Sequence, residues 1–360
     1  MARTFSRPRL GALAALTALG IAATAPLAAS SVPASAKTPL QRGLAFYRGQ
    51  TISFISDGAP GGEFDTIARD LAPYFSSYLH ATVNVEDISS GATIPGQNFA
   101  EAAAPNGLTI GEINAVGDAA NVLTHTLGIN FNPARVAYIA SYGPSPLVLL
   151  ATPASGITSF AQVKNATTPY RALTQATGTG PTITRSIMGV LHAPVNWLTG
   201  YANAGQQVAG FQRGDGQLAW VTLGVGGPLI QGGAAKVIAA TSKAPKGMAY
   251  GRLIANVPTT ADLLKQYPAK NRSERAAYAA VALIDQMAAV LPIFTQTGVD
   301  ATRVDALRAA AKWAFQQSSL RTELLNQGQN DQYADPVAAK QVYIDTLKDG
   351  AVLVPYFSAT

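Results

Sequence analysis

The sequence contains no cysteine and only three histidines. Without cysteine there is no disulfide framework, no thiolate metal site and no lipid-modified cysteine anchor. His80, His125 and His192 are far apart in the chain, so they form neither a local metal cluster nor an H-E-x-x-H motif. A G-x-S-x-G nucleophile elbow is also missing. We therefore expect a protein that is not an enzyme and that holds no metal or cofactor.

Charged residues are also scarce, at 13% of the chain, whereas hydrophobic residues make up 48%. This composition and the length of 360 residues predict a large core and about two domains. The formal net charge is +6, and removing the three arginines of residues 1–36 leaves +3. The remaining basic residues are scattered, with Lys243, Lys246 and Arg252 as the nearest approach to a cluster. A solvated loop explains them, and no nucleic-acid partner is expected.

Residues 1–36 have the pattern of a secretory signal peptide. A basic start is followed by a mostly apolar stretch, Leu10–Leu27, and by Ala34-Ser35-Ala36 as a cleavage motif. The pattern predicts cleavage near Ala36 and export to the periplasm or another extracytoplasmic space, without a lipid anchor. A membrane anchor is the alternative, but Thr17, Gly20, Thr24 and Pro26 weaken this stretch as a span. No later stretch approaches 18 uninterrupted apolar residues.

After a linker near residues 37–50, the first half alternates strand and helix patterns. Strands are expected at 51–56, 82–86 and 108–113, and helices at 64–79 and 95–104. The first helix carries an apolar stripe at i, i+3 and i+4 spacing: Phe64, Ile67, Ala68, Leu71, Phe75 and Leu79. The run Leu147–Ala151 suits a strand buried on both faces, as in a parallel sheet, near a crossing between two lobes.

The alternation of strand and helix patterns begins again at Arg171, so the second half repeats the architecture of the first. Strands are expected at 171–174, near 195, at 217–223 and at 236–240, and helices at 181–191 and 204–212. Helices at 278–290, 302–317 and from Asp335-Pro336 should pack back onto the first lobe. We therefore predict an α/β fold with two lobes, each a mainly parallel sheet flanked by helices. The expected parts are a signal peptide (1–36), lobe one (37–148 and 243–360) and lobe two (149–242).

Each lobe places a glycine-rich turn between a strand and a helix start. The first turn is Gly58–Asp65, with Pro60, Gly61, Gly62, Phe64 and Asp65, and the second contains Thr177, Gly178, Thr179 and Gly180. A helix start offers unpaired N–H groups and a partial positive charge, so it attracts an anion, and glycine allows close approach. Ser89–Gly96, which includes Ser90, Gly91, Ala92 and Thr93, is a third such segment. Ordinary turn and cap geometry is the alternative explanation for all three.

Three aromatic residues of the second lobe lie near expected strand ends: Trp197, Tyr201 and Trp220. Core packing explains them well, but Tyr201 follows Gly200 in a turn and could offer its hydroxyl to a ligand. Neither glycine-rich turn is a nucleotide fingerprint, because the third glycine of G-x-G-x-x-G is missing and no G-x-x-x-x-G-K motif occurs. Glu63 and Asp65 lie in a first helical turn, where acids favour the helix dipole, so a capping role competes with ligand contact.

The chain resembles a known family in several motifs. These are Gly58-Ala59-Pro60-Gly61-Gly62 with Asp65, Ala68 and Arg69; Val83–Glu86; Gly91-Ala92; Ala104–Ile110; and Thr177–Gly180. In order and spacing they are similar to the receptors of tripartite tricarboxylate transporters, the TctC-like or Bug-type solute-binding proteins. The resemblance covers most of residues 48–350 and is weak after 245. Asn106, Pro181, Gln217 and the segment 294–299 depart from the family pattern.

The resemblance implies a type II-like periplasmic-binding-protein fold with a ligand cleft between hinged lobes. It implies ligand contacts from Gly61, Gly62 and Asp65, from Ser90–Thr93, and from Thr177, Thr179 and Gly180. Pro60, Phe64, Tyr201 and Ala204 complete the expected set. It also implies a monomer that takes a small organic acid (a di- or tricarboxylate, an amino acid or an aromatic acid) and delivers it to integral-membrane transporter subunits. A ligand-presenting sensor receptor and an exported hydrolase or lyase are the alternatives.

Overall fold

The computed structural model describes residues 37–357 except 59, 89–93, 126–127, 129, 131, 144, 177 and 289–290. The expected signal peptide lies outside these residues and stays a prediction. Within the described range, no helix combines the length and the apolar character needed to span a bilayer.

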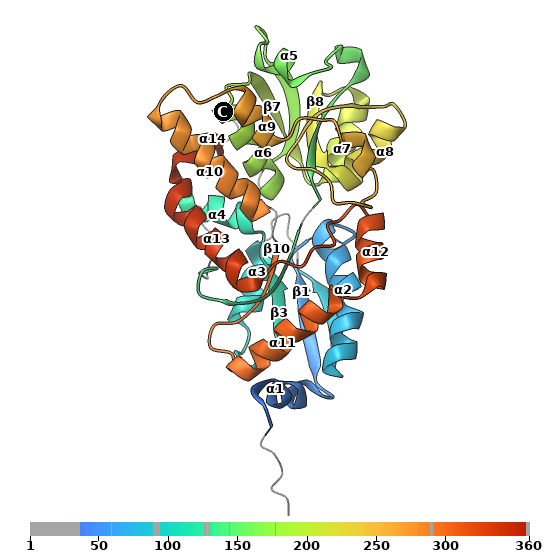
Figure 1. The fold of residues 1–360 in the computed structure, drawn as a ribbon, viewed down its shortest axis with the longest axis vertical. Helices are drawn as coiled ribbons and strands as arrows, with labels where there is room; N and C mark the ends of the chain where they lie inside the picture. The colour runs from blue at the N-terminus through green and yellow to red at the C-terminus, as the bar shows by residue number, and fades with distance from the viewer. Residues whose placement is uncertain are drawn as a thin grey trace, which may run out of the picture. The chain divides into compact units, whose positions relative to one another are not determined.

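The first of two five-stranded sheets has the strand order β2-β1-β3-β10-β4 (Figure 1). Its strands are β1 (Thr51–Ser56), β2 (Thr82–Asp87), β3 (Thr109–Glu112), β4 (Ala137–Tyr142) and β10 (Leu291–Thr295). β1 pairs in parallel with β2 and β3, whereas β10 runs antiparallel to β3 and β4. A strand from the last quarter of the chain therefore completes the first sheet, although the sequence pattern predicts only helices there.

The second sheet has the order β7-β6-β8-β5-β9. Its strands are β5 (Leu147–Ala151), β6 (Tyr170–Gln175), β7 (Val195–Tyr201), β8 (Leu218–Thr222) and β9 (Lys236–Ala240). β5 is buried along its whole length, as its apolar run predicts, but it pairs antiparallel with β8 and β9. The expectation of a parallel neighbourhood for β5 is wrong, because helices on both faces bury a strand whatever its direction. Both sheets are thus mixed, with one reversed strand each.

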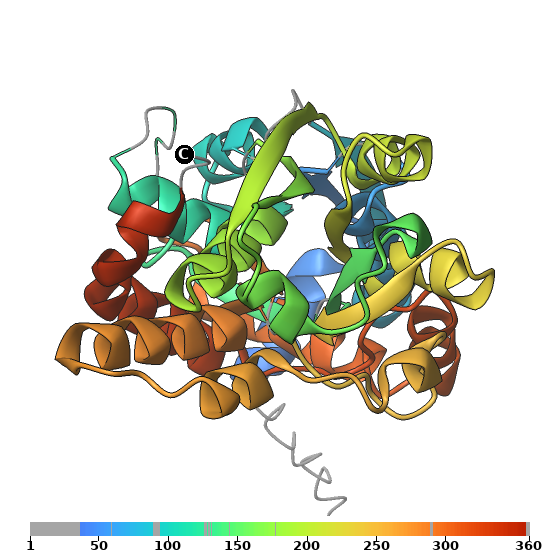
Figure 2. The same cartoon turned by 90° about the horizontal axis from the view of Figure 1, so that it is seen from above.

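Helices surround both sheets (Figures 1 and 2). They are α1 (Pro39–Tyr47), α2 (Glu63–Leu79), α3 (Ile94–Ala102), α4 (Ala115–Leu123), α5 (Phe160–Lys164), α6 (Thr179–Val190), α7 (Ala204–Arg213), α8 (Leu223–Gln231), α9 (Thr260–Gln266), α10 (Arg272–Ala288), α11 (Ala301–Ala314), α12 (Ser318–Asn326), α13 (Pro336–Asp349) and α14 (Val354–Phe357). Short 3-10 turns are η1 (Pro153–Ser155), η2 (Gly251–Ile254) and η3 (Gly350–Leu353).

The segment expected as a linker near residues 37–50 is helical instead. A capping box of Thr38 and Gln41 starts α1, and Pro39 occupies its first turn, where a missing N–H costs nothing. Tyr47 is fully buried and donates to the Gly107 carbonyl at 3.0 Å, and α1 packs on α11. Because α1 contains several polar residues, its sequence does not indicate a helix. These tertiary contacts stabilise it.

Side chains alternate between the two faces of each sheet, as strand geometry requires. In the first sheet, Phe54 packs with α2 and α11, whereas Ile55 faces the opposite side. In the second sheet, Leu150 packs with α7 and α8, and Leu149 lies in the same large cluster as Ile55. One continuous hydrophobic cluster therefore covers a face of both sheets.

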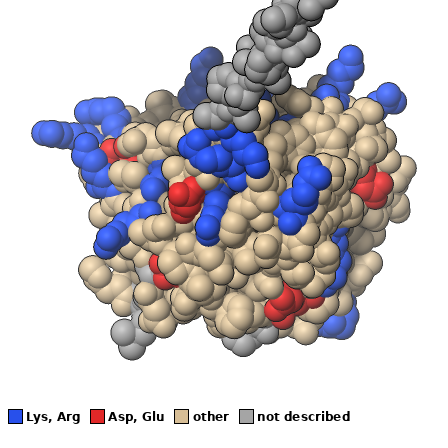
Figure 3. Space-filling model, turned by 90° about the horizontal axis from the view of Figure 1, so that it is seen from below, with Lys and Arg blue, Asp and Glu red and all other residues tan. Residues whose placement is uncertain are grey.

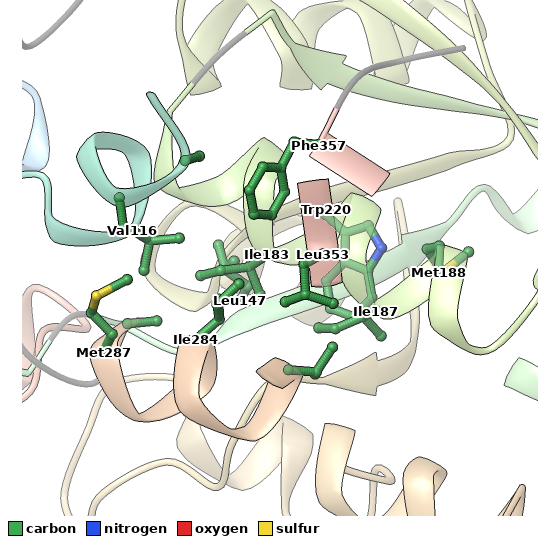
Figure 4. Packing of buried hydrophobic residues seen from close by; sticks show 14 of the residues in the cluster. Val116, Leu147, Ile183, Ile187, Met188, Trp220, Ile284, Met287, Leu353 and Phe357 are labelled. Atoms are coloured by element: carbon green, nitrogen blue, oxygen red, sulfur yellow. The ribbon is translucent and has the colours of Figure 1, made fainter. Parts of the chain in front are cut away.

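We call the first sheet with α1–α4, α11 and α12 the first lobe, and the second sheet with α5–α9 the second lobe. Helices α10 and α14 contact α4 of the first lobe and α6 of the second. Figure 4 shows this junction, where Val116 of α4, Ile183 and Ile187 of α6 and Ile284 of α10 lie close together. The expectation that the late helices pack on lobe one describes α11 and α13, whereas α10 contacts α6 of the second lobe as well as α4 of the first. The proposed domain boundaries stay a prediction.

Candidate functional site

The first glycine-rich turn joins β1 to α2 and has the backbone that its sequence predicts. Gly61 takes φ +73°, a left-handed conformation that favours glycine. At Gly58, an added Cβ would lie 2.9 Å from the Phe64 Cβ, so the turn has no room for a larger residue. Gly62 is the N-cap of α2 and offers no side chain to cap it. The first turn of α2 therefore begins with main-chain N–H groups that its own cap does not satisfy.

Asp65 binds its own loop. Its Oδ2 accepts a hydrogen bond of 2.7 Å from the Gly61 N–H, and its Oδ1 lies 2.5 Å from Nε of Arg69. Arg69 in turn donates to Asp87 at the end of β2, at 2.6 Å. The structure thus shows Asp65 in the competing role, as the group that fixes the turn. Direct ligand contact by Asp65 stays a prediction.

Residues 89–93 of the Ser89–Gly96 segment lie outside the described residues, and so does Thr177. Ser90, Gly91, Ala92 and Thr93 thus remain predictions as ligand contacts. The neighbouring described residues, Asp87 and Ile94, end β2 and start α3. β2 is the strand next to β1, and it ends at the same sheet edge as the first turn.

The second glycine-rich turn, at the start of α6, meets the first lobe directly. Gly178 is the N-cap of α6 with φ +112° and no side-chain cap. The Thr179 hydroxyl donates to Oδ1 of Asn114, which is the N-cap of α4 in the first lobe. A Cβ added at Gly180 would find no atom within 4 Å, so this position borders open space. Asn114 carries no motif, and sequence reasoning missed it.

A second contact between the lobes involves Glu63 at the start of α2. Its Oε1 accepts a 3.4 Å hydrogen bond from the N–H of Ser145, in the crossover between β4 and β5. Oγ of Ser145 in turn accepts from the Gly224 N–H, at the start of α8. Burial raises the pKa of Glu63 to about 7, and the Ser145 N–H opposes that rise. The start of α2 is thus linked through Ser145 to that of α8, and the start of α4 to that of α6, at the carboxyl ends of parallel strands.

Tyr201 and Ala204 lie at the same edge of the second sheet. Tyr201 ends β7 in register with Gln175, and its hydroxyl donates to Asp215 Oδ2 at 3.0 Å. Ala204 is the first residue of α7, which Asn203 caps. Trp220 is 5% exposed within the large cluster, and Trp197 packs partly buried against it. The core role is therefore shown for both tryptophans, whereas ligand contact by Tyr201 and Ala204 stays a prediction.

Three further acids of the first lobe lie close together around Asp57. Asp57 follows β1, Glu112 ends β3 and Asp118 lies on α4. Asp57 accepts a 2.6 Å hydrogen bond from Gln97, and Glu112 accepts one of 3.1 Å from the Tyr142 hydroxyl. Burial raises the pKa of Asp57 to about 8. Burial and, second, the charge of Asp57 hold the pKa of both Glu112 and Asp118 well above the usual range.

A buried cation lies behind the start of α6. The Arg185 side chain donates to the carbonyls of Gln175, Ala176 and Phe357 at 3.0, 3.1 and 2.9 Å. Its guanidinium also lies 5.9 Å from the centre of the Trp197 ring. Burial lowers its pKa, although an arginine stays charged over the physiological range. Arg185 thus holds the turn before Gly178 and places a positive charge beside it, a role that its position inside an expected helix did not indicate.

The two family departures in the second lobe have different surroundings. Pro181 lies in the first turn of α6, where proline suits a helix. Gln217 precedes β8, and its Oε1 accepts from the Arg171 N–H at 2.9 Å. Because β6 and β8 are parallel, this bond lies at the opposite end of the sheet from Gly178. Gln217 also borders two surface depressions of about 650 and 630 Å³, which share none of the residues of the glycine-rich turns.

Each of the three histidines lies just after the C-terminal end of a helix. His80, His125 and His192 all have positive φ, between 50° and 53°, just after α2, α4 and α6. Across the described ranges, no group of three or more His, Cys, Asp or Glu residues has a geometry that could hold a metal ion. Charged side chains of both signs are scattered over the face shown in Figure 3.

The two α/β lobes, joined by contacts at their strand ends, have the architecture of periplasmic solute-binding proteins, and structural comparison confirms that fold. A TctC solute-binding protein from Polaromonas matches with TM-score 0.64 and 15% identity, over 86% of this chain and 99% of that chain. MatC from Rhodopseudomonas palustris with bound malate matches with TM-score 0.65 and 17% identity, over 85% and 99%. R. palustris Rpa4515 with adipate matches with TM-score 0.66 and 14% identity, over 86% and 97%.

The likeness to TctC-type proteins that the motifs indicate is thus found again in three dimensions. No protein-family model matches the sequence, and no curated protein matches it either. At these identities the comparison establishes the fold.

Proposed function

We propose that this protein is an exported receptor that binds a small carboxylate between its two lobes and delivers it to a tripartite tricarboxylate-type membrane transporter. One observation carries the proposal: uncapped starts of α2 and α6, which belong to different sheets, lie at linked strand ends. Both starts carry main-chain N–H groups and the positive end of a helix dipole. Two such ends can share one anionic ligand, as in other helix-start anion sites.

The fold supports a binding role. Two structural neighbours carry small dicarboxylates, malate and adipate. In addition, the Thr179 hydroxyl at the start of α6 is bound to the Asn114 amide oxygen, which is no base. We therefore infer reversible binding without turnover. The signal-peptide pattern supports export.

A thermal-shift screen of organic acids tests this proposal. A ligand at about 100 times its Kd adds about 2.7 kcal/mol to the free energy of unfolding. For a chain of this size, that corresponds to a rise in Tm of roughly 4 °C. We expect one or more acids of the panel to give such a rise. No shift with any di- or tricarboxylate, amino acid or aromatic acid would count against the proposal, and turnover of a bound acid would favour the hydrolase or lyase.

The sensor alternative differs only in the membrane partner. Reconstitution separates the two roles, because a transporter receptor must increase uptake of its ligand by vesicles that contain the transporter subunits. Ligand binding without any such stimulation favours the sensor.

A further inference from the structure

The second lobe contains many basic residues and almost no acids. Residues 147–266 carry nine lysines and arginines, whereas Asp215 and Asp262 are the only acids in this range. The rest of the chain from residue 37 onward has more acids than basic residues. Such an imbalance between two parts of one chain indicates that the basic part meets a partner of opposite charge.

Three of these basic residues lie at one edge of the second sheet. β6, β8 and β9 run in the same direction, because β6 is parallel to β8, and β5 is antiparallel to both β8 and β9. Arg171 lies at the start of β6, Lys236 begins β9, and Arg213 ends α7 shortly before β8 begins. All three residues are exposed. They therefore gather at the sheet edge opposite to the start of α6.

The positive charges at this edge are only partly balanced. Asp215 accepts a 2.7 Å hydrogen bond from Arg213 and one of 3.0 Å from the Tyr201 hydroxyl. These hydrogen bonds and, more weakly, the charge of Arg171 lower the pKa of Asp215, so both arginines lie near one carboxylate. Among the described residues, the side chains of Arg171 and Lys236 have no hydrogen-bond or ion-pair partner. The edge thus keeps unpaired positive charge.

The same edge is hollowed on both sides of Gln217. One depression, of about 650 Å³, lies between α5 and the start of β6, and the other, of about 630 Å³, lies beside η1 and the C-terminal end of α7. Arg213 is the only charged residue that lines them. The other polar lining groups are neutral amides and hydroxyls, for example those of Asn165 and Gln212. The edge therefore combines a concave, hydrogen-bonding surface with a basic rim.

A protruding peptide segment fits this surface better than a membrane does. A bilayer attracts lysines and arginines through its anionic headgroups, but it is flat on the scale of one protein and does not fill a depression. A peptide segment can enter two adjacent depressions, where neutral amides and hydroxyls pair with its main-chain N–H and C=O groups. Carboxylates on such a segment match the planar guanidinium groups of Arg171 and Arg213.

We propose that this edge of the second lobe binds an acidic segment of a partner protein, with Arg171, Arg213 and Lys236 holding its carboxylates and the two depressions holding its chain. Recognition of acidic motifs by arginine clusters is a recurring mode of peptide binding. The inference goes beyond the proposed function and does not depend on it, because this surface and the start of α6 lie at opposite ends of the sheet. A partner at this edge leaves the linked turns uncovered.

Fluorescence anisotropy with two labelled peptides tests the inference on the full protein. The acidic probe consists of Glu-Ser repeats, and the neutral probe has glutamine in place of each glutamate. We expect the acidic probe to bind at least tenfold more tightly than the neutral one at low salt. Its affinity should fall at least tenfold at about 300 mM salt, because ions screen exposed charges. Equal affinity for the two probes, or no binding of either, overturns the inference.

Two double variants with the same change in net charge locate the site. Arg171→Gln with Lys236→Gln removes two charges beside the depressions and should weaken binding of the acidic probe at least fivefold. Lys246→Gln with Arg252→Gln is the matched control, which should keep wild-type affinity. Both control residues are exposed and lie in the segment that donates to the Leu325 carbonyl of the first lobe, away from this edge. Equal losses in both variants would show that only the net charge matters and would overturn the inference.

Vesicles of phosphatidylglycerol are the third probe, with phosphatidylcholine vesicles as the uncharged control. Vesicle binding that the Arg171 and Lys236 variant abolishes, without any binding of the acidic peptide, assigns the surface to a membrane and overturns the inference. Loss of peptide binding in that variant, but not in the control variant, supports it whether or not vesicles also bind. Circular dichroism verifies that both variants are folded.

Discussion

The buried acids of the first lobe predict that the free energy of unfolding falls as the pH rises from about 5 to 8. In the unfolded chain, aspartate and glutamate have pKa values near 4. In the folded protein, burial raises the pKa to about 7 for Glu63 and to about 8 for Asp57. The folded state therefore binds more protons than the unfolded state between these limits. Stability is fully present below pH 4 for these groups and is lost as the pH rises through 7 and 8.

The magnitude follows from linkage. Each proton held only by the folded state changes the free energy of unfolding by about 1.4 kcal/mol per pH unit. For Glu63, the rise from 4.5 to about 7 gives a loss on the order of 3 kcal/mol across the window. Asp57 extends the fall to about pH 8, and Glu112 and Asp118 act in the same direction.

Urea titrations at pH 5, 6, 7 and 8 in constant ionic strength measure this slope. The wild type should lose stability at each step, whereas Glu112→Gln should lose less between pH 6 and 8, because an amide has no proton to release. A wild-type stability that is flat or rises over this range would refute the reasoning. It would mean that these carboxyl groups titrate normally and that the site is more hydrated than the structure indicates.

Three further predictions concern the turns. Gly62→Val should weaken ligand binding at least tenfold, because the valine side chain blocks close approach of the ligand to the main chain. The circular dichroism spectrum should not change, since the backbone φ of −76° tolerates valine. Gln317→Val, at another helix start with φ −76°, is the control. Gly178→Ala, at φ +112°, should cost about 1–3 kcal/mol in urea unfolding through backbone strain and should also weaken binding; unchanged stability would contradict that backbone. Arg185→Met should lower stability by about 2–4 kcal/mol in the same assay, since three carbonyls lose their donor, and a neutral result would show that water replaces the guanidinium.

The sequence predicts the order of strands and helices in the first half of each lobe because local signals agree there. The apolar stripe of α2 and the turn before it indicate the same element boundary. It does not predict β10, because Leu291–Thr295 directly follows a helical pattern and forms a strand only between β3 and β4. Likewise, α1 depends on packing against α11. Elements whose stability comes from distant partners leave little local signal.

Of the candidate site, the sequence predicts only the turns that contribute main-chain groups. Glycine motifs identify the starts of α2 and α6, since positive φ at Gly61 and Gly178 is a local requirement. Charged members of the site have no comparable signal. Asp57 and Glu112 stand at strand ends, where polar residues are common, and their burial follows only from tertiary packing, including that of α3 on β1 and β3. An acid at the end of each of two expected neighbouring strands is the pattern that could have suggested them.

The packing around α4 and α6 bears on how such a site would select its ligand. α4 carries Asp118, and α6 begins at the turn held by Arg185. Both helices belong to one hydrophobic cluster that α10 and α14 complete (Figure 4). Close-packed interiors transmit strain instead of yielding to it, so the spacing between the starts of α4 and α6 is fixed by this cluster. We therefore expect sharp discrimination by chain length among the carboxylate ligands. Ile187→Ala, which removes buried methyl groups from α6 at this junction, should cost about 2–5 kcal/mol of stability and also narrow the affinity gap between five- and six-carbon dicarboxylates. An affinity gap that persists in the destabilised variant would show that ligand length is read by the turns alone.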